Sequence, residues 1–151
     1  MQDNTPQQGR KLPEVEFVTE DGSRVAAADL VGQQTVLYFY PKDDTPGCTK
    51  EACAFRDSME DYGAAGIKVY GVSLDSPESH RAFREKYNLN FPLLTDEDGR
   101  AARALGVLNE KKGSARRVTF LLAPDGEIER VYPEVSPETH ADEILADAAS
   151  R

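Results

Sequence analysis

The run at residues 35–40, Thr-Val-Leu-Tyr-Phe-Tyr, constrains the fold of this chain more than any other segment. It is a continuous stretch of β-branched, aromatic and other apolar residues, which is typical of a strand buried on both faces. Pro41 ends the run, because it has no backbone N–H to donate to a neighbouring strand. Such a strand predicts a central sheet that is covered on both sides.

Segments with strand-like and helical patterns alternate along the rest of the chain. Residues 14–18 and 24–26 flank the turn dipeptide Asp21-Gly22 and predict a hairpin. Helical patterns are expected at 48–64, 76–88, 99–105 and 136–149, and strands at 67–73, 93–94, 117–122 and 127–132. This order predicts an α/β fold with helices on both faces of the sheet.

The length of 151 residues suits one compact domain. We expect a flexible polar lead at residues 1–10 and a single domain at residues 11–151. The net charge of −9, with no basic stripe, argues against binding to nucleic acid or to an anionic membrane surface. The sequence shows neither an apolar run near the roughly 20 residues of a membrane span nor a signal-peptide pattern. We therefore expect a cytoplasmic protein.

Cys48 lies between the end of the buried strand and the start of the next helix. In open α/β sheets, sites form where strands end and helices begin. A reactive cysteine works as a thiolate, which the N–H groups of a helix N-terminus and a nearby cation stabilise. Gly47 allows a small ligand to approach the backbone, and the hydroxyl of Thr45 is within reach of the sulfur. The alternative is that Cys48 is a small core residue, as many cysteines are.

Cys53 follows five residues later on the same predicted helix. In the cytoplasm, thiols are kept reduced, so a cysteine pair is more often catalytic, redox-sensing or metal-binding than structural. An ideal helix separates the Cα atoms of residues i and i+5 by roughly 8.5 Å, whereas a disulfide needs less than about 7 Å. The two cysteines can therefore pair only if the first turns of the helix unwind. The alternative is an inert, buried Cys53.

Zinc binding is another chemistry that two cysteines suggest. A structural zinc site takes four ligands, commonly as two close pairs. The only further candidates, His80 and His140, are isolated in the sequence. We therefore expect no metal and no other cofactor, and we expect both histidines at the surface of helices.

The segment at residues 39–57, Phe-Tyr-Pro-Lys-Asp-Asp-Thr-Pro-Gly-Cys-Thr-Lys-Glu-Ala-Cys-Ala-Phe-Arg-Asp, resembles the signature of the peroxiredoxins. In particular it resembles the PrxQ subfamily, also called bacterioferritin comigratory proteins. The general pattern Pro-x-x-x-Thr-x-x-Cys is present as Pro41, Thr45 and Cys48, and Cys53 stands at the resolving position of PrxQ. The resemblance runs from about residue 11 to the C-terminus. It implies a thioredoxin-like fold, with a central mixed β-sheet flanked by helices.

The resemblance also implies the activity, which is reduction of hydrogen peroxide and organic hydroperoxides by thiol. Cys48 would attack the peroxide and become a sulfenic acid. Cys53 would resolve it as an intramolecular disulfide after local unwinding, and a thioredoxin-type donor would restore both thiols. Thr45 would hydrogen-bond the thiolate and orient the peroxide, and Pro41 would shield the sulfur from water. The subfamily is usually monomeric, so a monomer is expected.

Arg117 is the residue that matches the family arginine, which stabilises the thiolate and the charge on the leaving oxygen. It stands two positions before Thr119, as the family register requires, and strand alternation turns Arg116 to the opposite face. Glu51 occupies a position where relatives carry an acidic residue or Gln that orders the arginine. A carboxylate in a first helical turn is also favourable by itself. The expected substrate-binding set is Thr45, Gly47, Glu51 and Arg117.

Two other functions use the same residues. A thiol–disulfide redox sensor or relay would pass its oxidation to a partner protein. A catalytically silent thioredoxin-like binding module would neither reduce peroxide nor oxidise a partner. The joint presence of Thr45, Cys48 and Arg117 weighs against this possibility.

Overall fold

The computed structural model of the protein describes residues 9–133, 135–137 and 139–149. Residues 1–8 of the expected flexible lead lie outside this part of the chain. Within it, the N–H of Gly9 donates to the carbonyl of Ile128 at 2.7 Å, and Lys11 forms a β-bridge with Glu127. The chain is therefore paired with the sheet edge from Gly9 onward.

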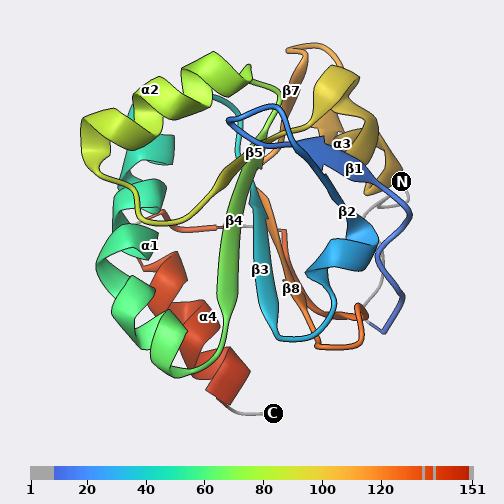
Figure 1. Ribbon diagram of the computed structural model, residues 1–151, viewed down its shortest axis with the longest axis vertical. Helices are drawn as coiled ribbons and strands as arrows, with labels where there is room; N and C mark the ends of the chain where they lie inside the picture. The colour runs from blue at the N-terminus through green and yellow to red at the C-terminus, as the bar shows by residue number, and fades with distance from the viewer. Residues whose placement is uncertain (1–8, 134, 138, 150–151) are drawn as a thin grey trace.

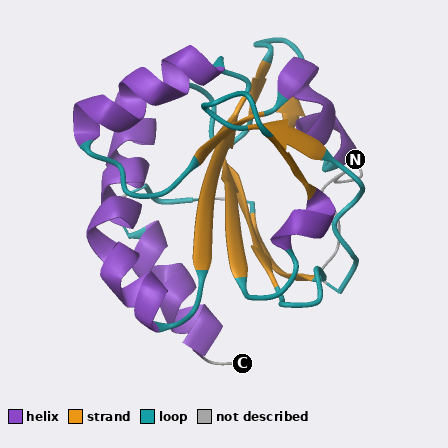
Figure 2. Cartoon of the chain, in the orientation of Figure 1, coloured by secondary structure: helices purple, strands orange, loops and turns teal. Residues whose placement is uncertain are grey.

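The described elements follow the predicted order (Figures 1 and 2). They are β1 (Glu16–Val18), β2 (Arg24–Ala26), the 3-10 helix η1 (Ala27–Leu30), β3 (Thr35–Phe39), α1 (Pro46–Ala64), β4 (Lys68–Ser73), α2 (Pro77–Tyr87), β5 (Leu93–Thr95), the 3-10 helix η2 (Glu97–Gly99), α3 (Arg100–Ala104), β6 (Leu108–Asn109), β7 (Ser114–Ala115), β8 (Val118–Leu122), β9 (Ile128–Tyr132) and α4 (His140–Ala149).

The main sheet has seven strands in the order β2-β1-β5-β4-β3-β8-β9. Strands β3, β4 and β5 run parallel, whereas β1 and β8 pair antiparallel with their inner neighbours. The sheet is therefore mixed, as expected. Figure 1 shows α1, α2 and α4 along one face of the sheet and α3 on the other.

Strand β3 lies at the centre of this sheet, and all its residues are buried. Val36 and Tyr38 point into the core under α1, α2 and α4, and Leu37 and Phe39 point into the core under α3 and η1. This alternation confirms the prediction of a strand buried on both faces.

Helix α1 begins two residues earlier than predicted, with Pro46 at its first position and Thr45 as N-cap residue. The fixed φ of proline suits a first helical position, where its missing N–H costs no intrahelical bond. The same arrangement starts α2, where the side chain of Ser76 accepts from the N–H of Ser79 at 3.1 Å. Both helix starts therefore follow from local sequence.

Two expectations about the C-terminal half need correction. Helix α4 begins at His140, four residues after the predicted start, and the carbonyl of Ser136 accepts from the N–H of His140 at 3.0 Å. The small hairpin of β6 and β7 was not expected, because its strands are only two residues long.

Among the described helices, none has the length and apolar content to cross a membrane.

Candidate active site

Cys48 occupies the third position of α1, which follows the buried strand β3 after a loop at residues 40–45. The first N–H groups of a helix have no intrahelical partner and carry partial positive charge. The thiol is buried, with 2% of the residue exposed. The sulfur therefore lies at the positive end of a helix of 19 residues and is largely shielded from water.

Arg117 comes directly before β8 and reaches this helix end. Strand β8 pairs antiparallel with β3, and Val118 lies opposite Phe39 at the carboxyl end of β3. The sheet register therefore brings Arg117 beside the loop that leads to Cys48, although the two residues are distant in sequence.

The guanidinium of Arg117 bridges two residues of α1. Its Nη2 donates to Sγ of Cys48 at 3.2 Å, and its Nη1 donates to Oε1 of Glu51 at 2.7 Å. Arg116 instead donates to the carbonyl of Gly106 at 2.6 Å. The cation beside the sulfur is thus Arg117, whose fixed fork can hold two partners at once.

Gly47 provides the room for this guanidinium. A Cβ atom built on Gly47 would lie 3.1 Å from Nη2 of Arg117. A larger residue would push the arginine away from the sulfur. Gly47 was expected to admit a small ligand to the backbone, and the group that approaches in the structure is Arg117.

Glu51 is completely buried and lies in the second turn of α1, because the helix begins at Pro46. The favourable first-turn position offered as its alternative role therefore does not apply. Burial raises the pKa of Glu51 to about 7, and Arg117 lowers it through its charge and hydrogen bond by less than burial raises it. The pKa of Arg117 is raised overall, because the charges and hydrogen bonds of Glu51 and Cys48 outweigh the effect of its own burial.

Two buried side-chain polar atoms in the described part of the chain have no hydrogen-bond partner within it, and both lie near Cys48. They are Oε2 of Glu51 and the hydroxyl of Tyr38. The pKa of Tyr38 is raised well above its usual value by burial first and then by the charges of Glu51 and Cys48. Unsatisfied buried polar groups are rare in folded proteins.

Cys53 carries a free thiol, as does Cys48. It is half-buried and lines a hollow of about 430 Å³ between α1 and α4, together with Lys50, Ala54, Asp57, Ser58, Ala141 and Asp142. The two cysteines therefore lie on one intact helix, and the more accessible one faces a surface hollow.

Thr45 and Pro41 lie in the loop between β3 and α1, and both are half-buried. The hydroxyl of Thr45 donates to the carbonyl of Lys42 at 2.9 Å, so its proton is directed at the loop backbone. The expected hydrogen bond from Thr45 to the Cys48 thiolate and the shielding role of Pro41 stay predictions.

The prediction that His80 and His140 lie on the surface is wrong. Both are buried, because each projects from the inward face of its helix. His80 bonds Asp43 at 2.8 Å and the carbonyl of Leu94 at 3.0 Å. His140 bonds the hydroxyl of Thr119 at 2.8 Å, and burial lowers its pKa.

Sequence reasoning missed His80 and Asp43 as members of this region. A signal was present, since His80, Phe83 and Tyr87 recur at a helical spacing that places them on one face. His80 and Phe83 are both buried on α2. The spacing identifies the inward face, but it does not identify the residue that His80 meets.

No cluster of three or more His, Cys, Asp and Glu side chains within the described ranges is arranged to hold a metal ion.

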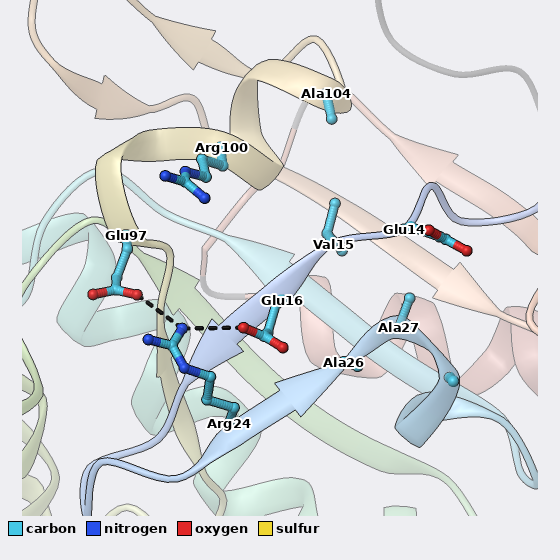
Figure 3. Close-up of a pocket in the computed structure, with 10 residues that line it drawn as sticks. Glu14, Val15, Glu16, Arg24, Ala26, Ala27, Glu97, Arg100 and Ala104 are labelled. Atoms are coloured by element: carbon cyan, nitrogen blue, oxygen red, sulfur yellow. Dashed lines mark hydrogen bonds and ion pairs between the residues drawn. The ribbon is translucent and has the colours of Figure 1, made fainter.

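A surface hollow of about 510 Å³ lies away from Cys48, between β1, β2 and α3 (Figure 3). Arg24 bridges Glu16 and Glu97 there at 3.1 and 3.0 Å, and all three side chains are more than half exposed. Exposed ion pairs of this kind contribute little stability, and none of the expected site residues lines the hollow.

Comparison with known proteins gives a consistent result. The model of the AhpC/TSA family matches residues 8–131. A putative peroxiredoxin bcp of Coxiella burnetii is 42% identical over 143 residues, which covers 91% of this chain and 95% of that protein.

Solved structures agree with the sequence match. Peroxidoxin BcpB of Mycobacterium tuberculosis overlaps with a TM-score of 0.89 at 32% identity, over 95% of this chain and 97% of that one. A Xanthomonas campestris bacterioferritin comigratory protein, described for its alkyl peroxide reduction activity, overlaps with a TM-score of 0.87 at 33% identity, over 95% and 98%. These overlaps confirm the expected thioredoxin-like fold.

Proposed function

Because the chain belongs to the AhpC/TSA family, among its Bcp/PrxQ peroxiredoxins, and is a thiol-dependent peroxidase, we propose that Cys48 is the residue that attacks the peroxide. The observation that carries this assignment is the 3.2 Å contact between its sulfur and Nη2 of Arg117 at the start of α1. A guanidinium and a helix N-terminus together stabilise a thiolate.

The first step is a displacement on the O–O bond. The Cys48 thiolate bonds to one peroxide oxygen, the O–O bond breaks, and the other oxygen leaves with the electron pair and takes a proton to become water or an alcohol. The cysteine becomes a sulfenic acid. Arg117 stabilises the charge that develops on the leaving oxygen, and Glu51 orders Arg117 through the 2.7 Å bond. Thr45 and Gly47 line the approach of the peroxide.

The second step joins Cys48 to Cys53. The Cys53 sulfur attacks the sulfenic acid, water leaves, and an intramolecular disulfide forms. Because both thiols lie on intact α1, roughly 8.5 Å apart at Cα by ideal helix geometry, the first turns must unwind to bring the Cα atoms within about 7 Å. A thioredoxin-type dithiol then reduces the disulfide by exchange.

The substrate class is hydrogen peroxide and organic hydroperoxides. The similarity to a protein described for alkyl peroxide reduction supports the second group. We further propose that the protein acts as a monomer in the cytoplasm, without nucleic-acid or membrane partners. Its net charge of −9 supports the absence of both partners.

Intact mass after one equivalent of peroxide tests the assignment. Wild type should lose about 2 Da as the disulfide forms, and Cys53→Ser should gain about 16 Da as the sulfenic acid is stranded. Cys48→Ser should do neither and should lose peroxide consumption. Retained turnover in Cys48→Ser would overturn the assignment. Negligible peroxide rates together with stable mixed disulfides on client proteins would instead identify a redox relay.

A further inference from the structure

The loop that leads to Cys48 is held against α2 by one buried carboxylate, that of Asp43. The hydroxyl of Tyr40 donates to its Oδ1 at 2.6 Å. The hydroxyl of Ser79 donates to its Oδ2 at 2.8 Å, and Nδ1 of His80 lies 2.8 Å from the same oxygen. Only 7% of Asp43 is exposed, and His80 is completely buried.

His80 is itself held on both sides. Its Nε2 faces the carbonyl oxygen of Leu94 at 3.0 Å, and this oxygen only accepts, so Nε2 carries a proton. The bond between Nδ1 and Asp43 needs one further proton, on either the ring or the carboxyl group. In either form the pair is neutral overall and hydrogen-bonded, the condition under which such groups are stable in a core.

The backbone of the same loop residue is fixed as well. The N–H of Asp43 donates to Oδ2 of Asp75 at 2.9 Å, and the hydroxyl of Ser73 donates to the same oxygen at 2.6 Å. Asp75 follows β4, so the loop is tied to the sheet as well as to α2. Both the side chain and the backbone of Asp43 are therefore immobilised five residues before Cys48.

The next residue, Asp44, has a left-handed backbone conformation with φ of 58°. This conformation is unfavourable for residues other than Gly, Asn and Asp. Its carboxylate accepts from Lys86 at 2.8 Å and from Tyr87 at 2.7 Å, again on α2. These contacts are exposed, and such ion pairs contribute little. Loss of a partner in the buried Asp43–His80 pair, by contrast, leaves a buried polar group unpaired, which is costly.

We propose that Asp43 and His80 are positioning residues for the peroxide reaction. They hold the loop of Pro41 and Thr45 at a fixed place relative to Cys48. The inference rests on the proposed function of Cys48. Misplacement of a reacting group by about 1 Å can cost on the order of a hundredfold in rate, so loosening this attachment should slow the peroxide step.

The experiment uses the Cys53→Ser protein as parent, so that only the first oxidation is observed. Stopped-flow measurements give the rate constant of Cys48 with hydrogen peroxide, and alkylation by iodoacetamide gives its general reactivity. Asp43→Ala and His80→Phe are the test variants. Both should slow the peroxide reaction by about tenfold or more, while alkylation is unchanged or faster because the loosened loop exposes the sulfur.

Asp43→Asn is the conservative variant, because its amide can donate to Nδ1 of a neutral His80 and its oxygen can accept from Tyr40. It should recover most of the peroxide rate. Asp96→Ala is the matched control, since Asp96 is an equally buried aspartate that accepts from the N–H groups of Ala101 and Ala102 and does not touch the loop. It should react with peroxide as fast as the parent.

Peroxide rates of His80→Phe and Asp43→Ala within twofold of the parent would overturn the inference. So would an equal loss of peroxide and alkylation rates, or an Asn variant as slow as the Ala variant. His80→Phe keeps the ring volume, so one test variant remains if Asp43→Ala fails to fold. A parent that does not react with peroxide would refute the proposed function instead.

Discussion

The guanidinium of Arg117 lies 3.2 Å from the sulfur of Cys48, although 69 positions separate the two residues in the chain. The same group binds the buried carboxylate of Glu51 at 2.7 Å. The arginine is therefore held from one side and presented to the sulfur on the other, and this arrangement depends on room left by Gly47.

Replacement of Arg117 by Ala should lower the rate constant for peroxide by about a hundredfold to a thousandfold, the usual cost of removing one donor from a developing charge. Arg117→Lys keeps the charge but loses the fork and should recover only part of the rate. Arg116→Ala is the control and should react as wild type does, because Arg116 bonds Gly106. Stopped-flow oxidation kinetics measure all three, and an unaffected Arg117→Ala would contradict the role.

Gly47→Ala should slow the peroxide reaction by about tenfold with little change in melting temperature, because the new methyl group displaces Nη2 of Arg117 by only a few tenths of an ångström. Gly63→Ala is the matched control on the same helix, since a Cβ there meets nothing within 4 Å. It should keep full activity and stabilise the protein by about 0.5–1 kcal/mol. Equal activity of the two variants would exclude a steric role for Gly47.

Glu51 should make folding stability depend on pH. Its pKa is raised from 4.5 to about 7 by burial, so the folded state binds its proton more tightly than the unfolded state does. The stabilisation of the folded state by this proton is fully present below about pH 4.5 and is lost as the pH rises through about 7. The loss is on the order of 3 kcal/mol.

The comparison with Glu51→Gln isolates this effect, because other titrating groups are common to both proteins. The stability of wild type relative to Glu51→Gln, from urea unfolding at several pH values, should fall across this window. A constant difference would show that Glu51 titrates normally.

Oxidation should open only the first turns of α1. Phe55 and Tyr62 are completely buried, Phe55 stacks on Tyr38 with ring centroids 4.7 Å apart, and the hydroxyl of Tyr62 donates to the carbonyl of Ala141 at 2.7 Å. These contacts anchor the rest of the helix. After one equivalent of peroxide, amide hydrogen exchange should accelerate at residues 47–53 and stay slow around Tyr62.

Cys53→Ser is the control for this measurement, because it is oxidised at Cys48 but cannot form the disulfide. Its amides at residues 47–53 should stay as protected as before oxidation. Unchanged exchange in oxidised wild type would mean that Cys53 is not the intramolecular partner.

The sequence predicts those helices and strands whose boundaries depend on residues next to them in the chain. The apolar run at 35–40 predicted β3, and the helical pattern at 76–88 predicted α2, each nearly to the residue. Helix α1 was predicted from Cys48, although Thr45-Pro46 is a local start signal of the same kind as Ser76-Pro77. The start of α4 was misplaced because Ser136-Pro137 has the same local pattern, yet the helix forms only from His140. The carbonyl of Ser136 nevertheless accepts from the N–H groups of Thr139 and His140, so the chain turns at the predicted start and the regular helix follows.

The candidate site divides in the same way. The position of Cys48 at a helix start indicated a reactive cysteine, whereas the resolving role expected of Cys53 and the choice of Arg117 over Arg116 came from the resemblance to the family. The pairing of β3 with β8 that brings Arg117 to Cys48 is a long-range contact, and no periodicity encodes it. The meeting of Asp43 and His80 across 37 positions is of the same kind and was missed.

The single helix that carries both cysteines also links folding to electron transfer. If Cys48 and Cys53 form the proposed disulfide, every interaction that stabilises the first turns of α1, including Pro46 at its first position, favours the dithiol over the disulfide. For a two-electron couple, about 1.4 kcal/mol of such stabilisation raises the reduction potential by about 30 mV. The stability of the helix start would therefore determine how readily the donor thiol reduces the disulfide. Substitutions there should change the reduction potential although the substituted residues do not contact either sulfur.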